Sequence, residues 1–141
     1  MAVKTYSPKK VSVVIGGFII SGYAEGSFVK VEYEEDAFTK VTGADGETSR
    51  THSANLSGSV TITLLQTSES NDVLAALALA DQLSLQGVVP ILVKDNNGTT
   101  FAGAPEAWVK KMPDAEFAKD MGEREWVIDC GAMLYKTGGN S

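Results

Sequence analysis

Residues 56–65, LSGSVTITLL, decide how this chain can fold. Alternate positions carry apolar side chains, with Gly58 among them: Leu56, Val60, Ile62 and Leu64. The positions between them carry only hydroxyls: Ser57, Ser59, Thr61 and Thr63. A period of two with one apolar face predicts an antiparallel strand that is buried on one side. The other face has no charge, so either it lines a special environment or it is an ordinary exposed strand rich in β-formers.

A helix is predicted directly after this strand. Ser70, Asn71 and Asp72 offer cap residues and an acidic group for its first turn, and Gly87 offers a stop. The spacing predicts a helix over about residues 73–85, whose first half, VLAALALA, is apolar all round. A helix on one sheet needs only one apolar stripe, so a second surface must cover this one, either the same fold or a neighbouring subunit. We favour a subunit contact, made by Leu74, Leu77 and Leu79.

The remaining sequence reads as short strands. Residues 28–34 alternate cleanly and place Lys30, Glu32 and Glu34 on one polar face. Pro90 predicts an edge position or a bulge in its strand. Further strands are expected at residues 10–20 (interrupted by two glycines), 37–42, 88–94, 99–102, 107–111 and 125–135. The expected fold class is mainly β: an antiparallel barrel or two-sheet sandwich with one flanking helix.

All 141 residues are expected to form one domain. Residues 43–55, GADGETSRTHSAN, contain no aliphatic side chain larger than alanine and predict a long loop, a feature that is often functional. An N-terminal arm, residues 1–9, and a polar tail, residues 136–141, are expected to be flexible.

The composition excludes much chemistry. Acids outnumber bases 18 to 12, and the net charge of −6 argues against a protein that grips DNA phosphates. One cysteine and one histidine cannot build a structural zinc site. His52 reads as a solvated loop residue, residues 34–36 (Glu-Glu-Asp) as a solvated turn, and Cys130 as a buried small hydrophobe. We therefore expect no enzyme activity, no catalytic residue, no cofactor and no metal.

No secretory signal is visible, and the longest apolar run, residues 73–80, is far shorter than the roughly 20 residues of a membrane span. A protein made in a cytoplasm, without membrane contact, is expected.

The order of four segments resembles the tail tube proteins of contractile-tailed bacteriophages. They are residues 6–36 (YSPKKVSVVIGGFIISGYAEGSFVKVEYEED), 43–51 (GADGETSRT), 56–72 (LSGSVTITLLQTSESND) and 123–131 (EREWVIDCG). The tubes of type VI secretion systems are similar in architecture. The resemblance implies a small β-barrel whose sheets join six copies into a ring, with rings stacked into a tube that carries DNA out of the capsid. It also implies contacts with sheath, tape-measure, baseplate and terminator proteins, and a place in the virion after assembly in the host cytoplasm.

Under this resemblance, residues 43–55 correspond to the hairpin or loop that reaches an adjacent ring, with Asp45, Glu47 and Arg50 as candidate contacts. The hydroxyl row at residues 57, 59, 61 and 63 is the favoured lumen face because it offers phosphates no strong binding site. The face with Lys30, Glu32 and Glu34 competes with it. Two alternatives stay open: a related ring component of a secretion machine or tail-completion protein, and a small ligand-binding β-barrel.

Overall fold

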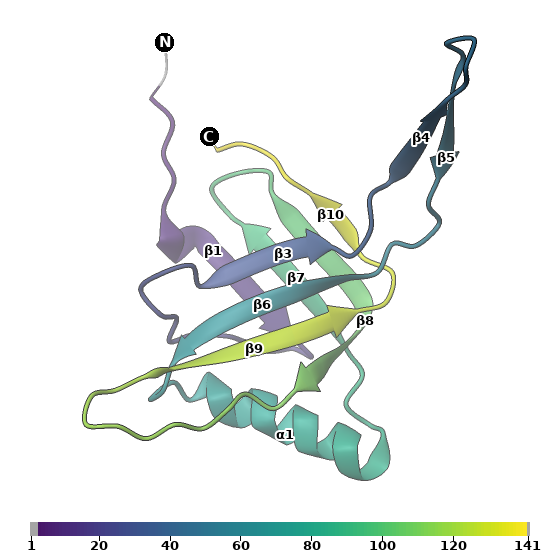
Figure 1. Ribbon diagram of the computed structural model, residues 1–141. Helices are drawn as coiled ribbons and strands as arrows, with labels where there is room; N and C mark the ends of the chain where they lie inside the picture. The colour runs from purple at the N-terminus through teal and green to yellow at the C-terminus, as the bar shows by residue number, and fades with distance from the viewer. Residues whose placement is uncertain (1–2, 141) are drawn as a thin grey trace.

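The computed structural model describes residues 3–140 (Figure 1). Its elements are a 3-10 helix η1 (Pro8–Lys10), β1 (Val11–Ile15), β2 (Phe18–Ile19), β3 (Val29–Tyr33), β4 (Phe38–Thr42), β5 (Thr48–His52), β6 (Gly58–Leu65), α1 (Ser70–Ser84), β7 (Val89–Asp95), β8 (Phe101–Lys111), β9 (Glu123–Cys130) and β10 (Leu134–Lys136). The mainly β, antiparallel class with one flanking α-helix is confirmed.

One curled antiparallel sheet holds most strands, in the order β2-β1-β7-β8-β9-β6-β3, with β10 on β8. The front layer comprises β3, β6, β9 and residues 107–111 of β8, which pair with β9. The back layer comprises β1, β2, β7, β10 and the rest of β8. The two end strands of the curl, β2 and β3, are not paired with each other, so the expected barrel does not close. Strand β8 pairs with strands of both layers, and the isolated bridge between Tyr23 and Leu64 adds a second link, from the segment after β2 to β6.

The core lies between the layers. On β6 the predicted alternation is confirmed, because Val60, Ile62 and Leu64 are fully buried and the hydroxyls between them point away from the core. On β9 the side chains of Trp126, Ile128 and Cys130 are buried beside them. The strand predicted over residues 125–135 ends at Cys130; Met133 then enters the core while Leu134 is exposed, so the alternation of Trp126, Ile128 and Cys130 does not continue through this segment.

Helix α1 begins three residues earlier than predicted and ends at Ser84. Residues 70–72 lie inside its first turn. The N-cap residue is Glu69, whose side chain makes no capping bond, and the Ser70 N–H donates to Ser68 Oγ at 3.2 Å. Leu85 takes the left-handed conformation at the C-terminus, with φ at 57°. Gly87 is still required, because a Cβ there would lie 2.5 Å from the Cβ of Asp81.

Residues 43–55 are not one long loop. Strand β5 forms inside this stretch and pairs with β4 in a two-stranded sheet that projects from the body of the molecule (Figure 1). All ten residues of the two strands are exposed, so β5 needs no apolar face. Without apolar alternation the sequence does not reveal it as a strand. The predicted strands at residues 99–102 and 107–111 are likewise one continuous strand, β8, and Pro90 marks the predicted bulge in β7.

Within the described residues, the N-terminal arm and the C-terminal tail both make hydrogen bonds to the β7–β8 turn, and their flexibility stays a prediction. In the tail, the Thr99 N–H donates to the Gly139 carbonyl at 3.0 Å, and Asn140 Nδ2 donates to Asp95 Oδ2 at 2.7 Å. In the N-terminal arm, the Thr5 carbonyl accepts from Asn97 Nδ2. Residues 1, 2 and 141 lie outside the described part of the chain.

Gly58 tests how closely β3 and β6 approach each other. A Cβ at this position would lie 2.5 Å from the Glu32 carbonyl oxygen and would also collide with the Met133 side chain. Gly58→Ala should therefore lower the free energy of unfolding by about 1–3 kcal/mol, as overpacking does. Urea unfolding measures this change. Gly26→Ala is the control, because nothing lies within 4 Å of its Cβ; equal effects of both variants would contradict the crowding.

Candidate assembly surfaces

The outward face of the front layer unites the two sets of residues that compete as lumen face in the sequence. Strand register places Lys30 beside Thr61 and Glu32 beside Ser59, so β3 and β6 present one continuous surface (Figure 1). On the other side of β6, Ser59 pairs with Asp129 and Thr63 with Glu125. A hydroxyl row is thus bordered by carboxylates on both sides. Lys30, the exception, lies 3.8 Å from the Glu32 carboxylate.

The carboxylates at residues 34–36 support the base of the hairpin. The Ser57 hydroxyl donates to Glu34 Oε2 at 2.8 Å, and the Ser53 hydroxyl donates to Glu35 Oε2 at 2.8 Å. These bonds join the end of β3 to the segment that follows β5. The acids are exposed and hold the chain's own hydroxyls, as expected of a solvated turn rather than a reactive cluster.

The β4–β5 hairpin carries a basic, aromatic face. The Arg50 guanidinium lies 4.1 Å from the centroid of the Phe38 ring, and the His52 ring lies 5.1 Å from it. Lys40 pairs with Arg50 across the strands, so all four side chains share one face. His52 is thus an exposed strand residue, not a loop residue. The sequence signal for this face is the period of two in residues 38–42 and 48–52.

The three candidate inter-ring residues have different positions on the hairpin. Asp45 shapes the turn, because its Oδ1 accepts from the Glu47 N–H at 3.1 Å. Glu47 lies in the same exposed turn, and Arg50 stacks on Phe38. The tip is therefore acidic, while the flank of the hairpin is basic.

Helix α1 has one covered side and one uncovered side. Leu74 is fully buried against the chain's own core and has no surface to offer a neighbour, and Leu77 is half-buried. Leu79 is 48% exposed, and Leu83, outside the predicted contact set, is 83% exposed. With the exposed Ala76 they lie at helical spacing, and we call residues 76, 79 and 83 the leucine stripe.

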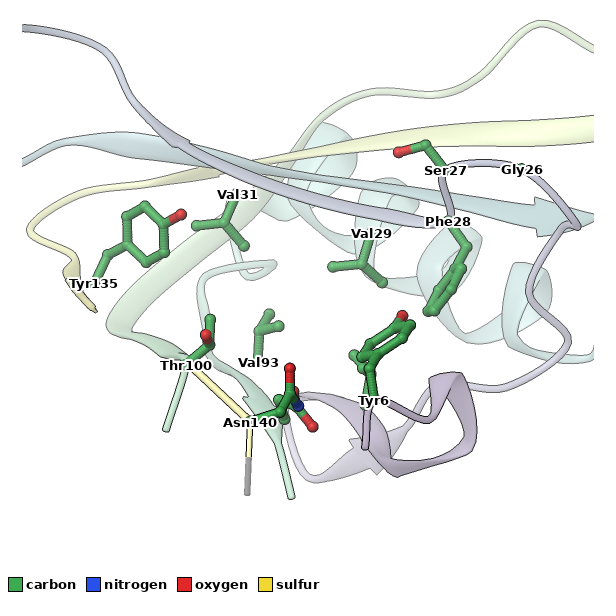
Figure 2. A pocket seen from close by; sticks show the side chains of 12 residues that line it. Tyr6, Gly26, Ser27, Phe28, Val29, Val31, Val93, Thr100, Tyr135 and Asn140 are labelled. Atoms are coloured by element: carbon green, nitrogen blue, oxygen red, sulfur yellow. The ribbon is translucent and has the colours of Figure 1, made fainter. Parts of the chain in front are cut away.

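A cavity of about 480 Å³ lies where the curled sheet fails to close. In this seam cavity, Val29 and Val31 of β3 face Val93 of β7, and Tyr6 and Phe28 lie together at one end (Figure 2). Tyr33 bounds the other end of β3, donating its hydroxyl to the Met133 carbonyl at 2.8 Å. The sequence predicts an inward apolar face for β3 but gives no sign that it lacks an opposing strand.

The side chains that commonly bind metals or act as nucleophiles do not cluster among the described residues. Among residues 3–140 no group of three or more His, Cys, Asp or Glu could hold a metal ion. Burial, together with the Asp129 charge, raises the pKa of the Cys130 thiol to about 11, so its nucleophilic thiolate is scarce at neutral pH. No helix in this part of the chain is long and apolar enough to cross a membrane.

The fold is similar to that of chains in a contractile injection system and in a gene transfer agent particle. A chain of the PVC sheath/tube terminator, from an extracellular contractile injection system in the extended state, superposes with a TM-score of 0.63. It is 13% identical, and the match covers 97% of this chain and 100% of that one. A chain of the native gene transfer agent virion superposes with a TM-score of 0.66 at 14% identity, covering 94% and 100%. At such identities the likeness concerns the fold.

Matches in amino-acid sequence identify the family to which the chain belongs. The family described as Bacteriophage PhiTE tail tube protein matches residues 3–138. Structural protein ORF10 of Pseudomonas phage KPP10 is 37% identical over 144 residues, which cover 96% of this chain and 83% of that protein. The chain belongs to the phage tail tube protein family and is a structural component of the phage tail.

The raised pKa of Cys130 predicts a pH dependence of stability. The unfolded thiol ionises near its ordinary pKa of 9.0, and the folded thiol only at about 11. The folded state therefore binds the proton more tightly. This contribution to the free energy of unfolding is complete below about pH 9 and is lost as pH rises toward about 11.

Urea unfolding of the wild type and Cys130→Ala across this range measures the effect. The difference between the two proteins should shrink as pH rises, and thiol reagents should label the wild type only when it unfolds. Rapid labelling of the folded protein at neutral pH would contradict the prediction.

Proposed function

We propose that copies of this chain join through their front layers into hexameric rings, and that the rings stack into the tube through which DNA leaves the capsid. The observation that carries the proposal is the front layer itself, which has four antiparallel strands and an unpaired edge on each side. An open sheet edge is normally covered or blocked. The number six rests on the family resemblance.

The β3 edge is ready to pair. The Phe28 carbonyl accepts from the Thr63 N–H, and the Glu34 N–H donates to the Ser57 carbonyl, so even-numbered residues bond to β6. In an antiparallel ladder the odd-numbered residues between them turn their backbone groups to the free side. At the opposite edge, the residues of β8 beyond Ala107 pair only with β9 in the described chain.

The two edges match in direction and in charge. Because the front layer has an even number of strands, β3 of one copy and β8 of the next run antiparallel when the layers join side by side. Exposed Glu32 lies on β3 and exposed Glu34 directly follows the strand, with Lys30 as the one cation among them, whereas exposed Lys110 and Lys111 lie on β8. Such a joint is head-to-tail, and it generates a closed ring when the rotation fits.

The joined front layers would turn their outward faces toward the channel. Hydroxyls bordered by carboxylates repel DNA phosphates over a distance of about 10 Å at ordinary salt, and Lys30, the cation on this face, lies 3.8 Å from the Glu32 carboxylate. A conduit needs this property more than affinity. The chain's role is then structural rather than catalytic, and its contacts are with further copies, sheath, tape-measure, baseplate and terminator proteins. Assembly would take place in the host cytoplasm.

A second candidate function is a terminating ring. The fold match to a sheath/tube terminator favours it, since such a subunit would form rings without propagating a tube. Electron micrographs of the purified protein separate the two functions, because a tube protein gives long uniform tubes and a terminator gives single rings. A protein that stays monomeric at high concentration would contradict both.

Charge reversal at the joint gives a sharp test of ring formation. The variant Glu32→Lys/Glu34→Lys has two basic edges, and Lys110→Glu/Lys111→Glu has two acidic edges. Each alone should assemble poorly, because like charges meet at every joint. Mixed in equal amounts they should form rings, since each acidic edge then meets a basic one.

Size-exclusion chromatography and micrographs of the single and mixed variants make the measurement. Normal rings from either variant alone, or no rescue on mixing, would count against the edge pairing. The wild type measured at the same concentration is the control.

The hairpin predicts a separate effect on stacking. Arg50→Glu removes the contact with Phe38 and places a negative charge beside Lys40, which cancels the positive charge of the flank, while leaving the front layer untouched. Tubes should become shorter or fall into single rings, and more so at low salt, where charges act over longer distances. Arg50→Lys keeps the charge and is the control. Mean tube length in micrographs decides the outcome, and unchanged tubes of Arg50→Glu would contradict a role of this flank.

A further inference from the structure

Two apolar surfaces of the single chain remain uncovered. One is the seam cavity at β3, with its lining of Val29, Val31 and Val93. The other is the leucine stripe of α1, where Leu83 is 83% exposed. Exposed leucines at helical spacing and an open apolar cavity on the same small chain are the kind of surfaces that association covers.

The elements that carry these surfaces lie at opposite edges of the front layer, with α1 next to the β8 edge and β3 at the other edge (Figure 1). Helix α1 contacts the C-terminal part of β8, and residues 78, 81, 82 and 85 share a small pocket with residues 108–112. The seam cavity borders β3, at the other edge of the front layer. Both lie on the core side of that layer. When β8 of the next copy joins β3, its helix is therefore carried to the mouth of the seam.

The charges around the two surfaces are complementary. Within Ser70–Ser84 the only charged residues are Asp72 and Asp81, and Glu69 precedes them. Beside the seam, η1 exposes Lys9 and Lys10, and Lys9 lines a hollow together with Phe28 of the cavity wall and Glu25, so two cations and one carboxylate lie there. An acidic helix and a basic rim attract each other and fix the orientation of docking.

Several polar groups in the cavity are bonded within the chain. Asp95 accepts from Asn140, and Thr100 Oγ1 accepts from the Gly138 N–H at 2.9 Å. The wall formed by Val29, Val31 and Val93 is apolar (Figure 2). An apolar protein segment suits this lining.

We propose that the leucine stripe of one copy fills the seam cavity of the next copy in the ring. The inference rests on the proposed ring and adds a second contact to the edge joint. The helix of each copy then completes the core of its neighbour, which accounts for a helix that is apolar on both sides. The contact is head-to-tail, because the stripe and the cavity are different surfaces of the same chain.

Substitution of the stripe tests the proposal. Leu79→Asp/Leu83→Asp places two charges against an apolar wall, so ring assembly should need at least about tenfold more protein. The matched control is Leu134→Asp, a leucine that is 68% exposed on the back layer and outside both surfaces. Circular dichroism verifies that each variant is folded. Rings of the double variant at the wild-type concentration would overturn the proposal.

Cross-linking gives an independent readout that needs no loss of assembly. Tyr6, 58% exposed at the mouth of the cavity, and Leu83 are replaced together by cysteine, while the buried Cys130 stays silent. Oxidation of the assembled protein should give a ladder of covalent oligomers, and neither Tyr6→Cys nor Leu83→Cys alone should give one. Dimers from Leu83→Cys alone would mean that helices meet each other, which overturns the proposal.

The outcomes also separate this proposal from the proposed function. If the wild type forms no rings, the proposed function fails and the docking fails with it. If the wild type forms rings but the cysteine pair gives no ladder, the docking alone is wrong.

Discussion

The pairing of β6 with β9 over eight residues, and with β3 over five, is the interaction on which the rest of the structure depends. Because side chains alternate along a strand, a slip of one residue would bury the hydroxyls of Ser59 and Thr61 and expose Val60 and Ile62. The fully buried apolar row forbids that slip. The same register then sets which residues face outward, where the β3 edge ends, and how the acids of β9 border the hydroxyls.

The sequence predicts those parts of the fold that have a regular period. The strand around residues 58–65 and the helix are found within three residues because their patterns repeat, whereas β5 is missed because Ser49, Arg50 and Thr51 have no apolar alternation. The failure of the sheet to close depends on distant strands that never meet, and no local pattern reports it. The prediction of Leu74 as a subunit contact is wrong, because the residue is buried in the chain's own core. The helical pattern shows that two sides of the helix need cover, but it does not show which side packs on the chain's own core.

The composition offers few residues of the types that form reactive sites, and the structure shows how several of the available polar groups are used. Several carboxylates that a reactive site could use accept hydrogen bonds within the chain. Serine hydroxyls donate to Glu34 and Glu35, and Asn140 donates to Asp95. The surfaces that remain unsatisfied are of another kind: sheet edges, an apolar cavity, a stripe of leucines and a basic hairpin flank. Such surfaces are completed by other protein chains rather than by small molecules.

The four strands of the front layer have a consequence for the joints of a ring. With an odd number per subunit, copies related by rotation would meet through parallel strands at every joint. With an even number every joint is antiparallel, and in neither case does the strand count limit the number of copies. In the proposed ring the number of copies would be set by curvature, which depends on strand tilt, stagger and the bulges in β8. The diameter of its channel would thus be a property of geometry at the joints, which sequence change can adjust without altering the fold.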